Sequence, residues 1–392
     1  MTDPLLPLLE ELGHIREKGL LRSMRRIDGM QGPVVRMDGR EVVLMCSNDY
    51  LGLAGHAELI EAAIEAVRGC GVGSGASRLI AGNMTIHEQL EHAIAEFKET
   101  DAALVFNSGY HANIGIISAI ADGDTAVLSD SLNHASIIDG VRLARARVFV
   151  YRHRDVNMIE DMLVSLGGKK TGDRTSKKLI VTDSVFSMDG DIAPLEEIAG
   201  LAQRYGAILM VDEAHATGIL GEHGRGVVEM LGLDGRVQVQ MGTLGKAFGS
   251  FGAYAAGSKL LIDYLVNRAR SFIFTTALPP AVCAVSSRAI DLVRSHPELR
   301  LALRDNIAFM RKGLRGLGFK VSDDPTPIIP MIIGDAEETM RASSVLLEKG
   351  VYVSGIRPPT VPEGTSRLRL TVTAAHTRDM LERVLDVIKV TL

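Results

Sequence analysis

The stretch AILMVDEAHATG, residues 207–218, joins five consecutive apolar residues to a polar segment that opens with Asp212. A continuously apolar run of this length is typical of a strand buried on both faces of a parallel sheet. Ligands of such sheets bind beyond the carboxyl ends of the strands. The sequence therefore places Asp212, and the residues that follow it, where a binding site is expected.

Short apolar runs of the same kind recur on both sides of this stretch, separated by longer segments with helical patterns. They are AALVF (102–106), TAVLS (125–129), RVFVY (147–151), KLIVT (178–182) and VQVQM (237–241). Most are followed directly by polar residues: NSGYHAN, DSLNHAS, DSVFSMDGD and GTLGK. The alternation predicts an α/β domain with a mainly parallel central sheet and helices on both faces. It also brings five strand ends to one crevice.

The rest of the chain predicts two further segments around this domain. Residues 1–47 contain a helical arm and a hairpin, VVRMDGREVVLM, whose Asp-Gly pair favours a tight turn. Residues 48–285 form the large sheet domain, and residues 286–392 form a smaller α/β domain. At 392 residues with 46% hydrophobic content, the chain is long enough for two or three globular domains.

Composition argues against several classes of protein. The net charge of -5, without basic tracts, gives no electrostatic footprint for nucleic acid or an anionic membrane. The first 20 residues lack the basic and apolar regions of a secretory signal, and no run approaches the roughly 20 apolar residues that span a bilayer. Three widely spaced cysteines, Cys46, Cys70 and Cys283, are expected to be reduced thiols. We therefore expect a cytoplasmic protein with small-molecule partners.

Two motif-like segments are not predicted to carry chemistry. GVGSGAS (71–77) has glycine spacing reminiscent of a dinucleotide loop, but it follows a helical pattern instead of a strand. HEQLEH (87–92) places its histidines five residues apart, so they do not share a helical face as zinc ligands would. We predict no metal.

Lys246 stands among small residues in MGTLGKAFGS, residues 241–250. A lysine in a water-poor pocket loses charge stabilisation, and its neutral amine can form a Schiff base with an aldehyde. Asp212 could be the counter-charge of a cationic ring nitrogen, and His215 could brace that acid or the ring. Alternatively, Lys246 could be a surface lysine in a glycine-rich turn, and Asp212 could cap a helix.

Other polar residues extend this hypothesis. The helix start at SGY, 108–110, could bind a phosphate through backbone N–H groups. Ser187, Thr243 and the Thr275-Thr276 pair could add hydroxyl donors, or they could be ordinary turn residues. His134 could stack on an aromatic ring or be a packed histidine. Arg367 and Arg369 alternate on a predicted strand and so point to opposite faces, and one of them could bind a carboxylate or form a surface ion pair.

Several longer segments occur together in order along the chain. They include SNDYLGLA, GSGASRLIAG, LNHASIIDG, VFSMDGDIAPL, VDEAHATG, GTLGKAFG, FIFTTALPP and IRPPTVPEGTSRLRLTVTAAH. With these segments the chain resembles, over nearly its whole length, the α-oxoamine synthases. These are pyridoxal 5′-phosphate-dependent transferases of fold type I, the aspartate aminotransferase fold, with a smaller C-terminal α/β domain.

The resemblance implies a role for each matching residue. Lys246 would bond to the cofactor's aldehyde, Asp212 would pair with the ring nitrogen, His215 would contact the ring hydroxyl and His134 would stack on the ring. The rest of the implied cofactor shell is Gly109, Tyr110, Ser187, Thr243, Thr275 and Thr276, and the implied substrate contacts are Arg22, Asn48, Thr360 and Arg369. Arg25 and Arg26 are alternatives to Arg22. Asp183 departs from the family, where glutamate is common, so its role stays open.

The resemblance also implies an activity. Family members are acyltransferases that condense an amino acid with an acyl thioester and release carbon dioxide, and they work as homodimers with active sites at the subunit interface. The segment IRPPTVPEGTSRLRL, 356–370, favours L-alanine with a pimeloyl group on coenzyme A or a carrier protein. The alternatives are glycine with acetyl-CoA, an aminotransferase, and a subunit that binds the cofactor without catalysing.

Overall fold

The computed structural model describes residues 3–167 and 177–392, and the chain divides into two compact units. Unit 1 comprises residues 1–48 and 303–392, and unit 2 comprises residues 49–302. This division differs from the three consecutive segments expected from the sequence. The physical reason is that β12 (Val351–Tyr352) pairs in parallel with β3 (Arg40–Leu44), which joins the N-terminal segment to the C-terminal one.

Unit 2 is built on a sheet of seven strands, counted within the described residues, in the order β4-β10-β9-β8-β7-β5-β6. The strands are β4 (Ala102–Phe106), β5 (Ala126–Asp130), β6 (Arg147–Tyr151), β7 (Lys178–Asp183), β8 (Ile208–Asp212), β9 (Val239–Thr243) and β10 (Ala253–Gly257). Five neighbouring strands, β6 to β9, run parallel, and β10 runs antiparallel between β9 and β4. The expected mainly parallel sheet is therefore confirmed, with β10 as an unexpected strand.

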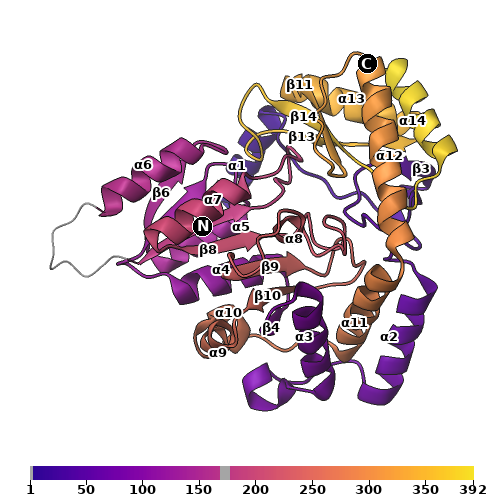
Figure 1. The fold of residues 1–392 in the computed structure, drawn as a ribbon. Coiled ribbons are helices and arrows are strands. Elements are labelled where there is room, and N and C mark those ends of the chain that lie inside the picture. The colour runs from indigo at the N-terminus through magenta and orange to yellow at the C-terminus, as the bar shows by residue number, and fades with distance from the viewer. Residues whose placement is uncertain (1–2, 168–176) are drawn as a thin grey trace. The chain divides into compact units, whose positions relative to one another are not determined.

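Helices lie on both faces of this sheet (Figure 1). The helices that lie wholly in unit 2 are α2 (Ala57–Cys70), α3 (Thr85–Lys98), α4 (Gly109–Ile120), α5 (Ala135–Ala144), α6 (Val156–Gly167), α7 (Leu195–Tyr205), α8 (Val227–Met230), α9 (Lys259–Arg268), α10 (Arg270–Ile273) and α11 (Pro280–Ser295), with a π-helical turn at Arg78–Gly82. The main core joins Ile116 of α4 and Val141 of α5 to Val181, Met210 and Val239 of the sheet. Each such side chain stabilises the fold by about 1.5–3 kcal/mol when fully buried.

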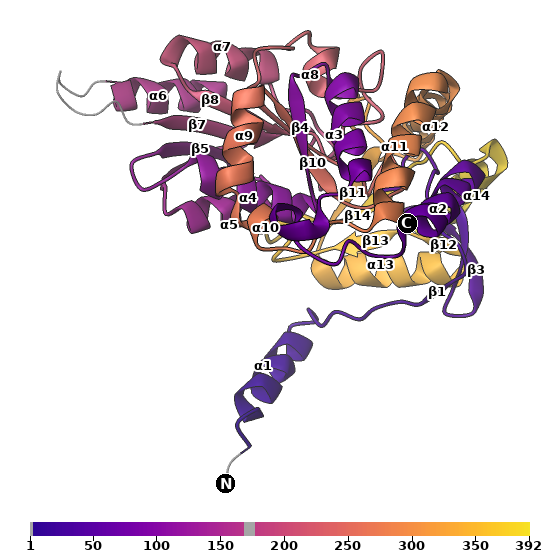
Figure 2. The same ribbon diagram turned by 90° about the horizontal axis from the view of Figure 1, so that it is seen from below.

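Unit 1 contains two small sheets within the described residues, ordered β1-β2-β3-β12 and β11-β14-β13. Its remaining elements are α1 (Leu6–Glu17), β1 (Ile27–Asp28), β2 (Val34–Met37), β11 (Ile328–Gly334), α13 (Ala336–Glu348), β13 (Ser354–Ile356), β14 (Ser366–Thr371) and α14 (Arg378–Lys389), while α12 (Pro297–Gly316) contains the boundary with unit 2. The expected hairpin is present, and Asp38 and Gly39 have φ values of 48° and 83°, as a tight I′ turn requires. Helix α1 buries no side chain, and an extended segment after it leads to the strands of its unit (Figure 2).

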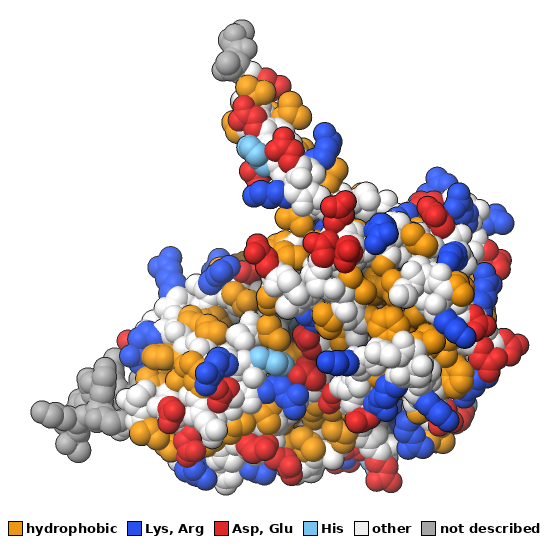
Figure 3. Space-filling view, turned by 90° about the horizontal axis from the view of Figure 1, so that it is seen from above, with side chains coloured by type: hydrophobic (Ala, Val, Ile, Leu, Met, Phe, Trp, Pro, Cys, Tyr) orange, Lys and Arg blue, Asp and Glu red, His pale blue; other side chains and the backbone are white. Residues whose placement is uncertain are grey.

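The surface carries charges of both signs. On the face shown in Figure 3, acidic and basic side chains are interspersed with apolar ones, without a broad patch of one sign. Among the helices in the described parts of the chain, none combines the length and the apolar character needed to cross a membrane.

Candidate active site

Lys246 lies in a tight turn that follows β9, and its side chain is half-buried. The turn is closed by hydrogen bonds from the Gly249 N–H to the Lys246 carbonyl (2.9 Å) and from the Thr243 hydroxyl to the Gly252 carbonyl (3.0 Å). Gly249 has φ +62°, and a Cβ at this position would overlap the backbone of residues 53–54. The small residues around Lys246 therefore satisfy the close packing of this turn, and Thr243 lies at its base.

The amine of Lys246 contacts a buried histidine. Its Nζ lies 2.9 Å from Nε2 of His215, and Nδ1 of the same ring lies 2.7 Å from the hydroxyl of Tyr50. Tyr50 is fully buried and His215 is 6% exposed. Since a tyrosine hydroxyl can donate or accept, it can support either tautomer of His215. The three side chains form a hydrogen-bonded chain that ends at the Lys246 amine.

Asp212 ends β8 and is buried. Its Oδ2 accepts a hydrogen bond from Nδ2 of Asn113 (2.8 Å), and its Oδ1 accepts one from the N–H of Ala214 (2.9 Å). Its carbonyl accepts from both the N–H and the hydroxyl of Ser184 (2.8 and 3.0 Å). These bonds fix the orientation of a buried carboxylate at the carboxyl end of the sheet.

His134 is the N-cap of α5, and its ring belongs to the same hydrogen-bond network. Its Nδ1 accepts from the N–H of Ser136 (3.3 Å) and lies 2.7 Å from the Ser136 hydroxyl, to which Asn113 donates (2.9 Å). Although His134 is exposed, partial desolvation lowers the pKa of its imidazole; the charge of Asp212 opposes this effect and that of Lys246 adds to it. The lowered pKa favours a neutral ring, which can pack against an aromatic cofactor.

Asp183 supports His134 from the neighbouring strand. It ends β7 in register with Asp212, and its Oδ2 accepts a hydrogen bond from the backbone N–H of His134 (2.8 Å). Burial raises the pKa of Asp183 well above its usual range, and the nearby charge of Asp212 raises it further. The role left open by the sequence is thus structural in this arrangement, because the shorter acid positions the residue that precedes α5.

The start of α4 offers backbone donors to an anion. Ser108 caps this helix by accepting from the N–H of His111 (3.2 Å), and Gly109 and Tyr110 are its first two residues. The amides of a first helical turn have no partner within the helix and favour phosphate. The hydroxyl of Tyr110 is bonded to Asp139 on α5, which orients its exposed side chain.

Three further predicted cofactor residues lie near other strand ends of unit 2. Asn107, which follows β4, donates from Nδ2 to the Thr275 hydroxyl (3.2 Å) and to the Thr276 carbonyl (3.0 Å). The two threonines therefore stand beside the residue that precedes the α4 cap. Ser187 is half-buried in the turn between β7 and α7, the turn that begins with Ser184.

The four predicted substrate residues lie in unit 1 and form two pairs. Arg369, buried in β14, donates to Oδ1 of Asn48 (3.3 Å), and Nη2 of Arg22 lies 3.5 Å from the Thr360 hydroxyl. Arg22 and Thr360 line a cavity of about 370 Å³, whose other lining residues include Arg25, Arg357, Ser343, Ser344, Ser354 and Tyr352. Of the two alternatives to Arg22, Arg25 lines the cavity, whereas Arg26 pairs with Asp28 (3.2 Å).

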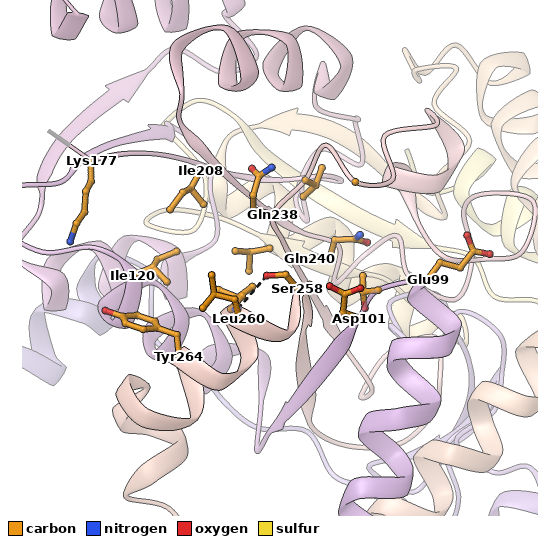
Figure 4. A pocket seen from close by; sticks show the side chains of 16 residues that line it. Glu99, Asp101, Ile120, Lys177, Ile208, Gln238, Gln240, Ser258, Leu260 and Tyr264 are labelled. Carbon is orange, nitrogen blue, oxygen red and sulfur yellow. Dashed lines mark hydrogen bonds between the residues drawn. The ribbon is translucent and has the colours of Figure 1, made fainter. Parts of the chain in front are cut away.

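A larger cavity of about 680 Å³ lies elsewhere in unit 2 (Figure 4). It is lined by Ile208 and Val239, at the amino ends of β8 and β9, and by Gly257, at the carboxyl end of the antiparallel β10. The candidate site instead occupies the carboxyl ends of the parallel strands. This cavity is therefore at the opposite end of the sheet from Lys246.

Sequence reasoning missed three members of the network: Asn113, Ser136 and Tyr50. Asn113 lies 99 residues before Asp212 in the chain, and its contact depends on the way α4 crosses the sheet. Asn113 lies in NSGYHAN, and Tyr50 lies in SNDYLGLA. Their place in these two polar segments was the signal that the sequence offered.

The two zinc-like histidines have structural partners. His87 is fully buried, accepts from the Met84 N–H (3.2 Å) and lies 2.9 Å from the Leu278 carbonyl. His92 is exposed and pairs with Glu96. In the described residues no cluster of three or more histidine, cysteine or acidic side chains could hold a metal ion.

The donor set of unit 2 fits pyridoxal 5′-phosphate. It offers an amine at Lys246, a fixed carboxylate at Asp212, a ring at His134 and the N–H groups that begin α4. The amine can react with the cofactor's aldehyde, and the carboxylate can pair with its ring nitrogen. The histidine can pack on its aromatic face, and the N–H groups can bind its phosphate. The fold and this site define the protein as a pyridoxal-phosphate-dependent transferase of fold type I.

The chain belongs to the α-oxoamine synthases, within the aminotransferase class I and II family, whose model matches residues 40–388. The 8-amino-7-oxononanoate synthase of Geotalea daltonii is 54% identical over 381 residues, which cover 97% of this chain and 96% of the relative. The enzyme of the same name from Citrifermentans bemidjiense is 54% identical over 382 residues, with coverages of 97% and 96%.

Solved structures agree with the fold and the cofactor. Serine palmitoyltransferase from S. paucimobilis, solved with a pyridoxal-phosphate adduct, has a TM-score of 0.92 and 31% identity, and the match covers 100% of this chain and 98% of that chain. The 8-amino-7-oxononanoate synthase from Francisella tularensis has a TM-score of 0.75 and 29% identity, with coverages of 89% and 97%. The expected fold class and cofactor are confirmed, and the chain is a pyridoxal-phosphate-dependent acyltransferase.

Proposed function

We propose that this chain condenses L-alanine with a pimeloyl thioester, the biotin-pathway reaction that gives 8-amino-7-oxononanoate, carbon dioxide and a free thiol. The curated relatives at 54% identity are named for this product. The observation that carries the choice of acyl group is the cavity that contains Arg22, Arg25 and Arg357. A pimeloyl chain ends in a carboxylate, whereas an acetyl group has no charge for these arginines to bind.

The chemistry of this cavity suits a carboxylate. Arginine binds planar anions through several N–H donors, and hydroxyl groups add neutral donors. Arg22 lies beside the Thr360 hydroxyl, and Arg25 and Arg357 line the same cavity with four serines. Together they provide a cationic, hydrogen-bonding environment for the far end of a dicarboxylic acyl chain. Arg369 would hold the carboxylate of the amino acid.

The residues of unit 2 supply the remaining steps. The cofactor, when bound, provides an electron sink for the electron pair of the broken Cα–H bond. Lys246 would hold its aldehyde carbon and Asp212 its ring nitrogen, with the shell completed by His134, His215, Gly109, Tyr110, Ser187, Thr243, Thr275 and Thr276. The Lys246 amine takes the alanine Cα proton, and His215, at 2.9 Å, exchanges protons with this amine.

The overall reaction balances without an external oxidant or reductant. A carbon–carbon bond forms between the alanine Cα and the thioester carbonyl carbon, and the carbon–sulfur bond breaks to release the thiol. The bond to the alanine carboxylate then breaks to release carbon dioxide, and a proton returns to the same carbon. Lys246 is the residue we assign to both proton transfers.

We also propose a cytoplasmic homodimer. Unit 2 exposes several large apolar side chains, among them Val72 (76%), Ile80 (82%), Phe251 (55%) and Phe274 (70%). The resemblance to the α-oxoamine synthases, whose members work as homodimers, implies that a subunit interface covers part of this apolar surface. Cys46, Cys70 and Cys283 are free thiols, which fits a reducing compartment. Light scattering at micromolar concentration tests the dimer, and a monomer mass would contradict it.

The substrate assignment is tested by a survey of amino acid and thioester pairs. The holoenzyme is incubated with alanine or glycine and with pimeloyl-CoA, pimeloyl carrier protein or acetyl-CoA, and thiol release is measured. Alanine with a pimeloyl thioester is expected to give the highest kcat/KM. A strong preference for glycine with acetyl-CoA would overturn the proposal, and amino transfer from alanine to a keto acid without thiol release would indicate an aminotransferase.

A further inference from the structure

A histidine outside the described network sits between two carboxylates. His153 follows β6, and its Nδ1 lies 3.0 Å from Oδ1 of Asp130 while its Nε2 lies 2.8 Å from Oδ2 of Asp191. The side chains of His153, Asp130 and Asp191 are 25%, 2% and 16% exposed. The ring meets Phe186 edge-on, with centroids 4.4 Å apart. This arrangement encloses the imidazole on three sides.

Both ring nitrogens of His153 face acceptors. A neutral imidazole carries one N–H, so it can donate to only one carboxylate, whereas the imidazolium donates to both. Burial of the ring lowers its pKa, but the hydrogen bonds to Asp130 and Asp191 outweigh this effect and raise the pKa of His153 to about 9. The charged form is therefore the form that joins the two carboxylates at neutral pH.

Each carboxylate belongs to a turn that carries a cofactor residue. Asp130 ends β5, and its Oδ1 accepts from the N–H of Leu132 (2.8 Å) in the turn that leads to His134. Asp191 belongs to the turn that carries Ser187, and its carbonyl accepts from the N–H of Phe186 (3.0 Å). His153 therefore bridges residues 130–134 to residues 184–193.

We propose that His153 is a positioning residue, which clamps the 130–134 turn to the 184–193 turn so that His134 and Ser187 are held together for the cofactor. The inference concerns the cofactor site and does not depend on which substrates the enzyme accepts. It can therefore fail while the proposed reaction stands, and it can hold if the substrate survey gives a different pair.

One further charged residue, Arg154, contacts both carboxylates of this clamp. Arg154, from the same turn as His153, donates its N–H to Oδ2 of Asp130 (2.9 Å) and its guanidinium to Oδ2 of Asp191 (3.1 Å). Asp130, Asp191 and Arg154 are thus the charged groups that face His153. Because the folded-state pKa of His153 is raised above the usual 6.5, its contribution is complete below pH 6.5 and is lost as the pH rises through about 9.

The test compares His153→Gln with a matched histidine variant, His92→Gln, at an exposed position of α3. Pyridoxal 5′-phosphate is titrated into each apo protein between pH 7 and 10, and the thermal unfolding of the apo proteins is followed over the same range. We expect His153→Gln to bind the cofactor about tenfold more weakly at pH 7.5 and to show a reduced loss of thermal stability between pH 8 and 10. We expect His92→Gln to match the parent in both measurements.

Unchanged cofactor affinity together with the parent's alkaline profile in His153→Gln would overturn the inference. If this variant fails to fold, Asp191→Asn provides the second measurement, because it keeps His153 but removes one carboxylate. The ¹⁵N resonances of His153 in the apo protein should then titrate at a lower pH than in the parent. An unshifted titration, with unchanged cofactor affinity, would contradict the clamp.

Discussion

Nζ of Lys246 lies 2.9 Å from Nε2 of His215, so the proposed catalytic amine already has a partner that can donate or accept a proton. The other ring nitrogen of His215 is held by Tyr50 at 2.7 Å. When Lys246 is charged, it donates to Nε2, and Nδ1 carries the proton toward the tyrosine oxygen. When Lys246 is neutral, the tautomer reverses. The pair therefore accommodates both protonation states of the amine without moving heavy atoms.

Tyr50→Phe is expected to impair this exchange. Removal of the hydroxyl leaves a buried imidazole nitrogen without this partner, which costs about 1–2 kcal/mol. We expect kcat to fall about tenfold and the pH–rate profile to shift. The control is Tyr264→Phe, which removes a hydroxyl that donates to the Ala119 carbonyl, and this variant should behave like the parent. A Tyr50→Phe enzyme with the parent profile would remove the tyrosine from the account.

Asp212→Ala is expected to lower both cofactor retention and turnover. The substitution removes the acceptor of Asn113 and the carboxylate assigned to the ring nitrogen. We expect turnover to fall by about 100-fold or more, since preorganised charges contribute on this scale. Dialysis followed by cofactor absorbance measures retention, and Asp263→Ala, which removes an exposed acid paired with Lys259, is the control. Parent-like turnover in Asp212→Ala would require another explanation of the electron sink.

Arg22→Ala is expected to raise KM for the pimeloyl thioester and leave KM for alanine unchanged. A hydrogen bond to a charged group contributes about 1.5–3 kcal/mol, which corresponds to about a tenfold to hundredfold change. Steady-state kinetics with each substrate varied in turn separates the two effects. Arg26→Ala is the control, because its side chain pairs with Asp28 and is 76% exposed. Equal effects of the two variants would contradict the assignment of the cavity.

Lys98→Met is expected to destabilise the fold strongly. Lys98 ends α3 and donates to Oε2 of Glu213 (2.6 Å), and the two side chains are 1% and 0% exposed. Loss of one partner leaves a buried charge and costs about 3–5 kcal/mol. Chemical denaturation measures the change in the free energy of unfolding, and Glu213→Gln in the Lys98→Met background should restore part of it. No loss of stability in Lys98→Met would show that the pair contributes nothing.

The strands that carry the site could be predicted from the sequence because their burial on both faces leaves continuous apolar runs. AALVF coincides with the buried β4, and the polar residues after the buried runs include His134, Asp212 and Lys246. RVFVY coincides with β6, but this edge strand is mostly exposed, with Val148 at 47% and Val150 at 53%, so its apolar run does not reflect burial on both faces. Strand β10 was not predicted, because AYAAG lacks the β-branched residues of a typical strand. Its small side chains give no strand-like pattern, and its antiparallel pairing with β4 and β9 depends on tertiary contacts.

Contacts between distant segments could not be predicted from local patterns. Asn113 joins Asp212 to Ser136 across α4, α5 and β8, and no spacing in the sequence encodes this meeting. The pairing of β12 with β3 similarly links residues more than 300 positions apart, so a division into consecutive segments failed to represent it. The reactive residue types could be identified from the sequence, whereas the residues that support them could be identified only from the folded structure.

The most direct test of the central claim is borohydride reduction of the holoenzyme, followed by digestion and peptide mapping. Reduction fixes the cofactor to the amine that holds it. The account predicts a phosphopyridoxyl group on the peptide that contains Lys246, and its absence from that peptide in Lys246→Ala. A label on another lysine of the chain, or no label on an enzyme that still condenses alanine with the thioester, would contradict the account.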